Sequence, residues 1–167
     1  KALEIDDSFA EGHASLAWVM ALYEWDWAGS EREFQRSIAL NPNYATAHQW
    51  YGIVLWNTGR LEEALAQERR ALELDPLSMI INRNVGDVLL YQHKYDLAIA
   101  QYRKTLELDP NSAHSYSNRG PTYRKQENYP AALADYTQAI ELDPKYAQAY
   151  YNRGLTYRKQ ENYPAAL

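Results

Sequence analysis

The apolar residues of this chain recur at helical spacing, in pairs of stripes that are separated by short polar turns. In residues 79–112, the first stripe contains Val85, Leu89 and Leu90, and a polar turn follows at residues 93–96. The second stripe contains Leu97, Ala98, Tyr102, Leu106 and Leu108. Intervals of three and four residues place these side chains on one face of a helix, whereas a strand would require alternation. The pattern predicts two antiparallel helices in this segment and an all-α fold.

The same two-helix pattern returns with a period of 34 residues. Three series of residues mark the period: Pro42, Pro76, Pro110 and Pro144; Gly52, Gly86, Gly120 and Gly154; and Ala64, Ala98, Ala132 and Ala166. Small side chains allow the paired helices to approach closely, and each proline ends a second helix because it disfavours helical geometry in the preceding residue. Three independent positions on one period indicate a repeat array rather than a single globular core.

A 34-residue unit with Gly at position 8, Ala at positions 20 and 27 and Pro at position 32 resembles the tetratricopeptide repeat (TPR) family. The resemblance covers essentially the whole chain and implies a right-handed superhelical solenoid of antiparallel helix pairs. We expect a single array over residues 1–167. It comprises the tail of a preceding repeat at 1–9, repeats at 10–44, 45–78, 79–112 and 113–146, and a partial repeat at 147–167. We expect the chain to belong to a longer array, because both ends fall within repeats.

Several features depart from the repeat pattern. The unit at 10–44 has one extra residue, and Glu68 stands where the other units have an aromatic side chain. Those aromatic residues are Phe34, Tyr102 and Tyr136. Pro121 stands inside a predicted first helix, where the next unit has Leu155. A helix-interior proline costs about 3 kcal/mol, so we predict a kink or local loosening there. Pro121 is one of only two differences, in 18 positions, between residues 116–133 and the corresponding stretch one unit later.

Composition and charge exclude several classes of function. The net charge of −5 disfavours binding to nucleic acid. Residues 1–60 carry 4 basic and 8 acidic side chains, a net charge of −4, whereas residues 113–167 carry 7 and 5, a net charge of +2. Because the chain has no Cys, it has no disulfide framework and no thiolate metal site. No apolar run approaches the roughly 18 residues that span a bilayer, so we expect no direct membrane insertion. A cytoplasmic location is favoured over a periplasmic one.

Motifs of enzymes and metal sites are missing from the sequence. It contains no Gly-rich phosphate loop, no His-Glu-x-x-His and no nucleophile elbow. His13 and His48 both occupy position 4 of their units, without a carboxylate or second His at i+3 or i+4. We therefore interpret them as helix-packing residues rather than metal ligands. We expect no enzymatic activity, no cofactor and no metal.

The first candidate binding feature is a column of asparagines. Asn84, Asn118 and Asn152 occupy position 6 of three successive units. The resemblance implies that first helices line a concave groove and that this position points into it. A carboxamide has both donors and an acceptor, so it can bind a peptide backbone amide in both directions. The alternative is a solvated polar residue on a helix.

The second candidate feature is basic. Arg124, Lys125, Arg158 and Lys159 recur at positions 12 and 13 of the last two units, and Arg119 and Arg153 recur at position 7. Acidic peptides or a C-terminal carboxylate are the natural ligands of such side chains. The alternative is a solvated face with Glu127 and Glu161 as partners. Arg83 and Asp87, on the first helix that carries Asn84, complete the polar part of the candidate groove.

The third candidate feature is aromatic. Trp18, Trp50 and Trp56 lie at or near groove positions, and Trp50 is included in the candidate site. Packing between units is the favoured interpretation, because a Trp in a thin array is usually buried. Trp25 and Trp27 flank an irregular turn, and residues 24–29 resemble repeat arrays attached to bacterial transcriptional regulators and cyclases. This motif points to a bacterial source.

These observations favour a non-catalytic scaffold that binds an extended, acidic or polar peptide segment of a partner protein in the groove. One alternative is an assembly subunit that forms homo-oligomers through its array ends. Another is the regulatory region of a larger bacterial regulator or enzyme. RNA binding is disfavoured by the net charge and by the strict 34-residue period.

Overall fold

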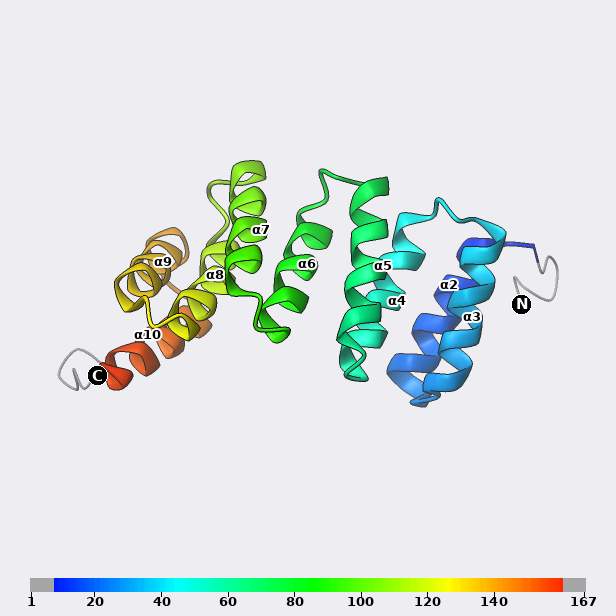
Figure 1. The fold of residues 1–167 in the computed structure, drawn as a ribbon, viewed down its shortest axis with the longest axis horizontal. Helices are drawn as coiled ribbons and strands as arrows, with labels where there is room; N and C mark the ends of the chain where they lie inside the picture. Colours follow the sequence, from blue (N-terminus) through cyan, green and yellow to red (C-terminus); the bar gives the residue numbers. More distant parts are fainter. Residues whose placement is uncertain (1–7, 161–167) are drawn as a thin grey trace. The chain divides into compact units, whose positions relative to one another are not determined.

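A computed structural model describes residues 8–160, and every regular element in that range is helical (Figure 1). The helices are α2 (Ala10–Val19), the π-helical segment η1 (Met20–Glu24), α3 (Trp27–Leu40), α4 (Ala45–Asn57), α5 (Leu61–Leu74), α6 (Met79–Tyr91), α7 (Tyr95–Leu108), α8 (Ala113–Lys125), α9 (Tyr129–Leu142) and α10 (Ala147–Lys159). The predicted all-α fold is therefore confirmed for this part of the chain. None of the described helices is long and apolar enough to cross a bilayer.

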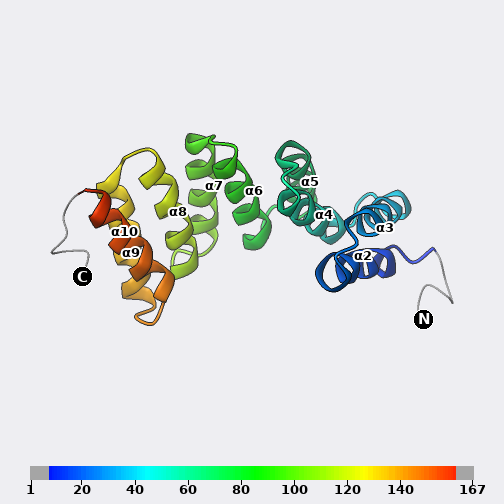
Figure 2. The same cartoon turned by 90° about the horizontal axis from the view of Figure 1, so that it is seen from below.

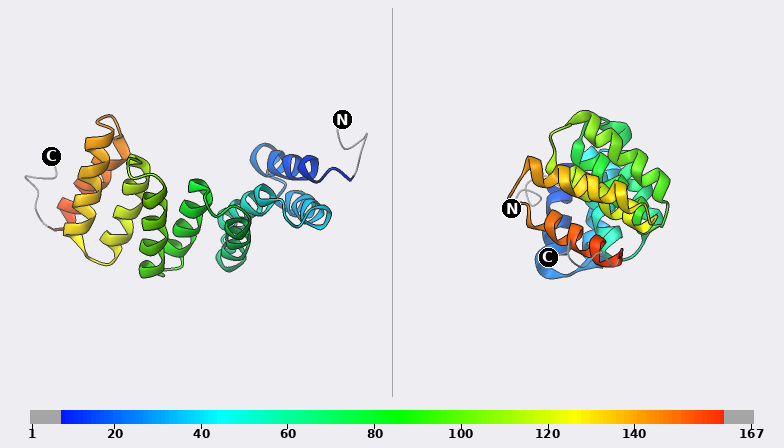
Figure 3. Two further views of the ribbon diagram at one scale, coloured as in Figure 1. Left: turned by 90° about the horizontal axis from the view of Figure 1, so that it is seen from above. Right: turned by 90° about the vertical axis from the view of Figure 1, so that its left-hand side faces the viewer.

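The chain divides into two compact units, residues 1–84 (unit 1) and residues 85–167 (unit 2), and the boundary falls within α6. In unit 1, α2 packs on α3, α4 packs on α5, and α3 also contacts α4 (Figure 2). In unit 2, α8 packs on α9, and α10 contacts both of them (Figure 3). Short turns join the two helices of each pair, so the helices run antiparallel.

In the interior of the helix pairs, a large side chain of the second helix packs against a glycine of the first. Tyr102 of α7 is fully buried and lies against Gly86 of α6, where an added Cβ atom would come within 2.7 Å of the ring. Glu68 of α5 takes the same place against Gly52 of α4, where an added Cβ atom would lie 2.8 Å from its Cγ. The recurring glycines are therefore required by close approach, because any larger residue would displace these side chains.

A left-handed backbone conformation closes the turn within each pair. It occurs at Trp25, Gly59, His93 and Glu127, with φ between 56° and 80°. These positions are 34 residues apart, although α2 begins 35 residues before α4. The extra residue of the first unit therefore lies before Trp25. The π-helical segment η1 accommodates it, since a π-bulge adds one residue to a helix.

Pro121 lies inside α8 and is half-buried. The helix continues without interruption from Ala113 to Lys125. The expectation that Pro121 loosens α8 therefore stays a prediction about the stability of this helix.

Candidate functional site

The asparagine column is not uniformly exposed. Asn84 is only 1% exposed, and its Nδ2 donates a 3.1 Å hydrogen bond to Oε1 of Glu68. Its Oδ1 accepts a 3.0 Å hydrogen bond from Arg83, which is half-buried. The Asn84 amide therefore forms an interior contact instead of offering both groups to a peptide. In unit 2, Asn118 is half-buried on α8 and Asn152 is 8% exposed on α10.

Asp87 also has an interior partner. The hydroxyl group of Tyr102 donates a 2.6 Å hydrogen bond to its Oδ1. Asp87 is half-buried on α6, and the Tyr102 ring below it is fully buried. This contact fixes the Asp87 carboxylate at the surface of α6.

The basic residues fall into two groups. Arg124 and Lys125 lie in the last turn of α8, and Arg158 and Lys159 lie in the last turn of α10. Lys125, Arg158 and Lys159 are exposed, whereas Arg124 is half-buried. The four cations thus occupy the C-terminal ends of two helices of unit 2, where they also complement the helix dipoles.

Arg119 belongs to the interior. Its guanidinium group donates two hydrogen bonds, of 2.8 and 2.7 Å, to the carboxylate of Asp135, and the two side chains are 15% and 6% exposed. The rings of Tyr116 and Tyr123 lie 5.6 and 5.5 Å from the guanidinium carbon. Burial raises the pKa of Asp135, although Arg119 acts in the opposite direction. The guanidinium group of Arg119 is therefore paired with the buried carboxylate of Asp135.

A pocket of about 390 Å³ lies between the end of α6 and the middle of α8 in unit 2. Its lining residues are Leu90, Tyr91, His93, Pro121 and Lys125. Asn118, Pro121 and Lys125 are spaced by three and four residues, so they share one face of α8. The sequence identified Lys125 as a candidate but not His93 or Tyr91, because the pocket forms only when α6 and α8 pack together.

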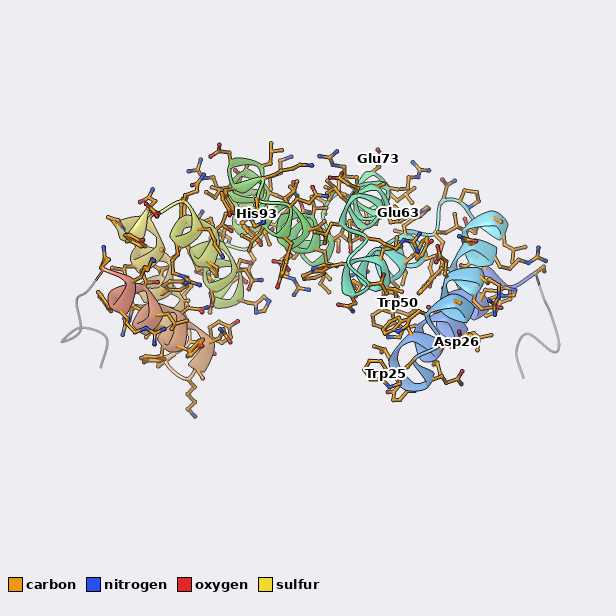
Figure 4. All side chains as sticks on the ribbon, turned by 60° about the horizontal axis from the view of Figure 1, so that its bottom comes forward. Trp25, Asp26, Trp50, Glu63, Glu73 and His93 are labelled. Atoms are coloured by element: carbon orange, nitrogen blue, oxygen red, sulfur yellow. The ribbon has the colours of Figure 1, made fainter. Side chains whose placement is uncertain are left out.

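Trp50 lies in unit 1 and stacks on Trp18, with ring centroids 5.2 Å apart and planes inclined by 27°. Both rings are half-buried. Figure 4 shows Trp50 on α4 and Trp25 at the nearby turn, on the same side of unit 1. Trp50 therefore packs on a Trp of the other first helix in unit 1, although neither ring is fully buried as the packing interpretation expected.

A second pocket, of about 250 Å³, lies in unit 1 between α3 and α4, and Glu31, Tyr51 and Arg60 form part of its lining. The Tyr51 hydroxyl group and the Arg60 guanidinium group donate hydrogen bonds of 2.6 and 2.7 Å to Glu31. These two donors lower the pKa of Glu31. Burial is the main cause that raises the pKa of Tyr51 to about 12. The carboxylate of Glu31 thus accepts hydrogen bonds from the other two polar side chains, Tyr51 and Arg60.

The histidines at position 4 pack against second helices. His13 is 4% exposed and its Nδ1 lies 2.6 Å from Glu33, and His48 is 5% exposed and its Nδ1 lies 2.7 Å from Gln67. Within residues 8–160, no group of three or more His, Cys, Asp or Glu side chains is arranged to hold a metal ion.

Comparisons with known proteins agree with this architecture. The chain matches a family model described as TPR repeat over residues 86–125 and 120–161, and one described as tetratricopeptide repeat over residues 21–78. No curated protein matches the chain.

Three solved structures illustrate the likeness of fold. YrrB, described as "a TPR protein with an unusual peptide-binding site", has a TM-score of 0.78 at 24% identity, with 100% of this chain and 86% of that chain covered. MamA from Desulfovibrio magneticus RS-1, from residue 41 to its end, has a TM-score of 0.82 at 20% identity, with 95% and 89% covered. PilF from Pseudomonas aeruginosa has a TM-score of 0.81 at 26% identity, with 99% and 75% covered.

Proposed function

Because the chain belongs to the tetratricopeptide repeat family, we propose that it is a scaffold that binds an extended, acidic or polar segment of a partner protein along α8 and α10. TPR arrays are generally non-catalytic scaffolds for protein–protein interaction. The proposed peptide-binding residues of unit 2 are Asn118, Arg124, Lys125, Asn152, Arg158 and Lys159.

The pocket beside Lys125 carries this proposal. Its apolar walls suit one side chain of an extended ligand, and the exposed ammonium group of Lys125 suits an acidic neighbour of that side chain. Asn118 lies two helical turns before Lys125 on the same face, where its carboxamide suits a backbone amide of the ligand. The similar fold of YrrB, whose description includes a peptide-binding site, supports the class of ligand.

A charge-reversal pair tests the proposal. An acidic peptide is selected on an array probed with the wild-type protein, and its affinity is measured by fluorescence anisotropy. Lys125→Glu is expected to weaken binding about tenfold or more, because it replaces an attraction with a repulsion at the pocket. Lys145→Glu makes the same charge change at an exposed residue outside the pocket and serves as the matched control. Equal affinities for both variants would refute the proposed site.

One observation favours assembly as a second candidate function. Leu16 and Val19 of α2 are 38% and 43% exposed, whereas Tyr51 and Val54, which lie 35 residues later on α4, are 5% and 4% exposed. The face of α2 that corresponds to the face α4 buries against α3 is thus exposed among residues 8–160, and we propose that a second copy of the chain covers it. Sedimentation at several concentrations tests this, with Val19→Glu expected to abolish any association that the wild type shows.

A further inference from the structure

The turn between η1 and α3 in unit 1 exposes a tryptophan to solvent. Trp25 is 70% exposed, and its backbone has the left-handed conformation with a φ of 56°. The residues at the corresponding turns of the next three helix pairs have the same conformation and are also exposed; they are Gly59, His93 and Glu127. The exposure of Trp25 is therefore a property of this turn position. Among these four turns, the first alone presents an indole ring.

Contacts within the turn hold the Trp25 ring in place. A bulky residue in the left-handed region persists only where its surroundings fix it, and such residues gather at ligand-binding sites. Trp25 and Trp27 form an edge-to-face pair, with ring centroids 5.8 Å apart and planes inclined by 78°. The backbone N–H of Asp26 donates a 3.1 Å hydrogen bond to the carbonyl oxygen of Met20. The indole ring is thus both exposed and preorganised, which lowers the entropic cost of binding a ligand.

Two carboxylates flank this indole ring in the sequence. Glu24 precedes Trp25 and is exposed, and Asp26 follows it and is half-buried. Oδ1 of Asp26 accepts a 2.8 Å hydrogen bond from the backbone N–H of Gly29 and so caps α3. Within residues 8–160, neither carboxylate forms an ion pair with a Lys, Arg or His side chain. The turn therefore combines an open indole ring with two negative charges that no neighbouring cation compensates.

The first helices of unit 1 add no positive charge to this surface. Residues 8–27, which contain α2 and η1, include Glu11, Glu24 and Asp26 but no Lys or Arg. Helix α4 contains no Asp, Glu, Lys or Arg, and the nearest basic residue along the chain is Arg32, in the second turn of α3. In unit 2 the composition is reversed, since α8 and α10 contain Arg and Lys but no Asp or Glu. The charge of unit 1 therefore favours a cation as the ligand.

We propose that the Trp25 turn, residues 24–27, binds an arginine side chain of a partner protein, with the guanidinium group on the Trp25 ring and beside Glu24 and Asp26. Tryptophan attracts cations more strongly than the other aromatic side chains. Arginine suits the turn better than lysine, because its planar, weakly hydrated group combines stacking on a ring with hydrogen bonds to a carboxylate. The inference goes beyond the proposed function, which concerns unit 2 and a ligand of the opposite charge.

An apolar surface beside the turn suits the rest of the partner segment. Leu22 is 44% exposed and follows Trp18 by four residues, and Trp18 stacks on Trp50 of α4. Trp50 and Trp25 lie on the same side of unit 1 (Figure 4). This surface differs from the α2 face considered for assembly, because Trp18 and Val19 are adjacent residues and point about 100° apart around the helix. A segment in which apolar residues flank the arginine therefore fits unit 1.

A blocked arginine tests the site. The indole N–H signals of the five tryptophans are assigned by single substitutions and followed by NMR during titration with Nα-acetyl-argininamide. Nα-acetyl-citrullinamide, a neutral analogue of nearly the same shape, is the control ligand at equal ionic strength. We expect the Trp25 and Trp27 signals to shift saturably with the arginine probe, and the citrulline probe to bind about threefold more weakly or less. An absence of shifts in these two signals, or equal affinities for both probes, would overturn the inference.

Three variants separate the contributions of the ring and of the charges. Trp25→Leu removes the indole ring, and Glu24→Gln and Asp26→Asn each remove one negative charge. Asn caps helices as well as Asp does, so Asp26→Asn should preserve α3. Followed at the Trp27 signal, each variant should weaken binding of the arginine probe about threefold. Tyr151→Leu removes an aromatic side chain that is 63% exposed in unit 2 and should leave the affinity unchanged. Wild-type affinity in Trp25→Leu, or in both charge variants, would contradict the proposed site.

Trp25→Gly distinguishes ligand binding from a structural role of the tryptophan. Glycine adopts a positive φ without strain, as Gly59 does at the next turn with a φ of 80°. The relief of strain offsets the lost ring contact, so the urea midpoint of the variant should stay close to that of the wild type. Its affinity for the arginine probe should nevertheless fall as in Trp25→Leu. A variant that loses stability but keeps its affinity would show that Trp25 serves packing alone.

A peptide and a dilution series identify the occupant of the surface. Acetyl-Leu-Arg-Leu-amide should bind more tightly than the single blocked arginine, because its apolar residues contact the surface around Leu22 and Trp18. Equal affinities would mean that the turn takes a free cation and not a protein segment. Spectra of the protein alone are also recorded at several concentrations, and the Trp25 signal should not move. If it shifts with protein concentration, a second copy of the chain covers the turn and the proposed partner is wrong.

Discussion

The side-chain amide of Asn84 donates a 3.1 Å hydrogen bond to Glu68, and both side chains are buried. Glu68 occupies the position of the buried aromatic residues in the other helix pairs, against Gly52. A carboxyl group in this interior requires a hydrogen-bond partner, because an unsatisfied buried polar group is destabilising. The asparagine column therefore combines a structural residue in unit 1 with half-buried or buried residues in unit 2.

Replacing Asn84 should reduce stability rather than affinity alone. Asn84→Ala removes a donor from a buried carboxyl group, and we expect a loss of about 1–3 kcal/mol in the free energy of unfolding. Asn118→Ala affects a half-buried amide, so its free energy of unfolding should lie within about 0.5 kcal/mol of the wild-type value. Urea unfolding followed by circular dichroism measures both. Similar losses for the two variants would contradict the structural role assigned to Asn84.

The ion pair between Arg119 and Asp135 should act as a coupled unit. Asp135→Ala leaves the guanidinium group of Arg119 without its partner in a largely buried site. We expect the free energy of unfolding to fall by about 3–5 kcal/mol. Replacing both residues by leucine should be less destabilising, because no uncompensated charge remains. Urea unfolding of the single and double variants provides the comparison. A double variant that is less stable than Asp135→Ala would argue against this account.

The helical fold could be predicted from the sequence because its signals are local and repeated. The 34-residue period of prolines and glycines, together with apolar intervals of three and four, indicates paired helices without any knowledge of their contacts. The glycine at each crossing has a physical reason that the structure makes specific, as the ring of Tyr102 against Gly86 illustrates.

The side-chain partners could not be predicted in the same way. Glu68 lies 16 residues before Asn84, and Glu33 lies 20 residues after His13, so each contact depends on how separate helices pack. Residues at i+3 and i+4 are neighbours on the same helix, so this spacing does not reveal a partner that lies on another helix. Pro121 departs from the repeat pattern in the sequence, but its place in a pocket depends on the position of α6 relative to α8.

Acid should weaken the Glu31 cluster of unit 1. Hydrogen bonds from Arg60 and Tyr51 hold the pKa of Glu31 below its ordinary value of 4.5. A carboxylate with a lowered pKa in the folded state contributes stability above its unfolded pKa, and that contribution is lost as the pH falls through the folded pKa. The stability advantage of the wild type over Glu31→Gln should therefore be present at about pH 7 and decline from about pH 5 downward.

Urea unfolding of both proteins across this pH range measures the effect. In an Arg60→Gln background the main donor to Glu31 is missing. The difference in the free energy of unfolding between Glu31 and Glu31→Gln should therefore shrink at every pH. A difference that stays constant between neutral and acidic pH would show that the Glu31 contacts do not depend on its charge.

Pro121 should lower the stability of α8 even though the helix remains continuous around it. A proline inside a helix removes one backbone hydrogen bond and costs about 3 kcal/mol. The corresponding residue of α10 is Leu155, so leucine is compatible with this position of the repeat. We expect Pro121→Leu to raise the free energy of unfolding by about 1–3 kcal/mol and to slow amide hydrogen exchange in the preceding turn. Gln126→Leu, just after the end of α8, tests whether added apolar surface alone has the same effect. Unchanged thermal stability and exchange in Pro121→Leu would mean that the surrounding contacts already compensate the proline.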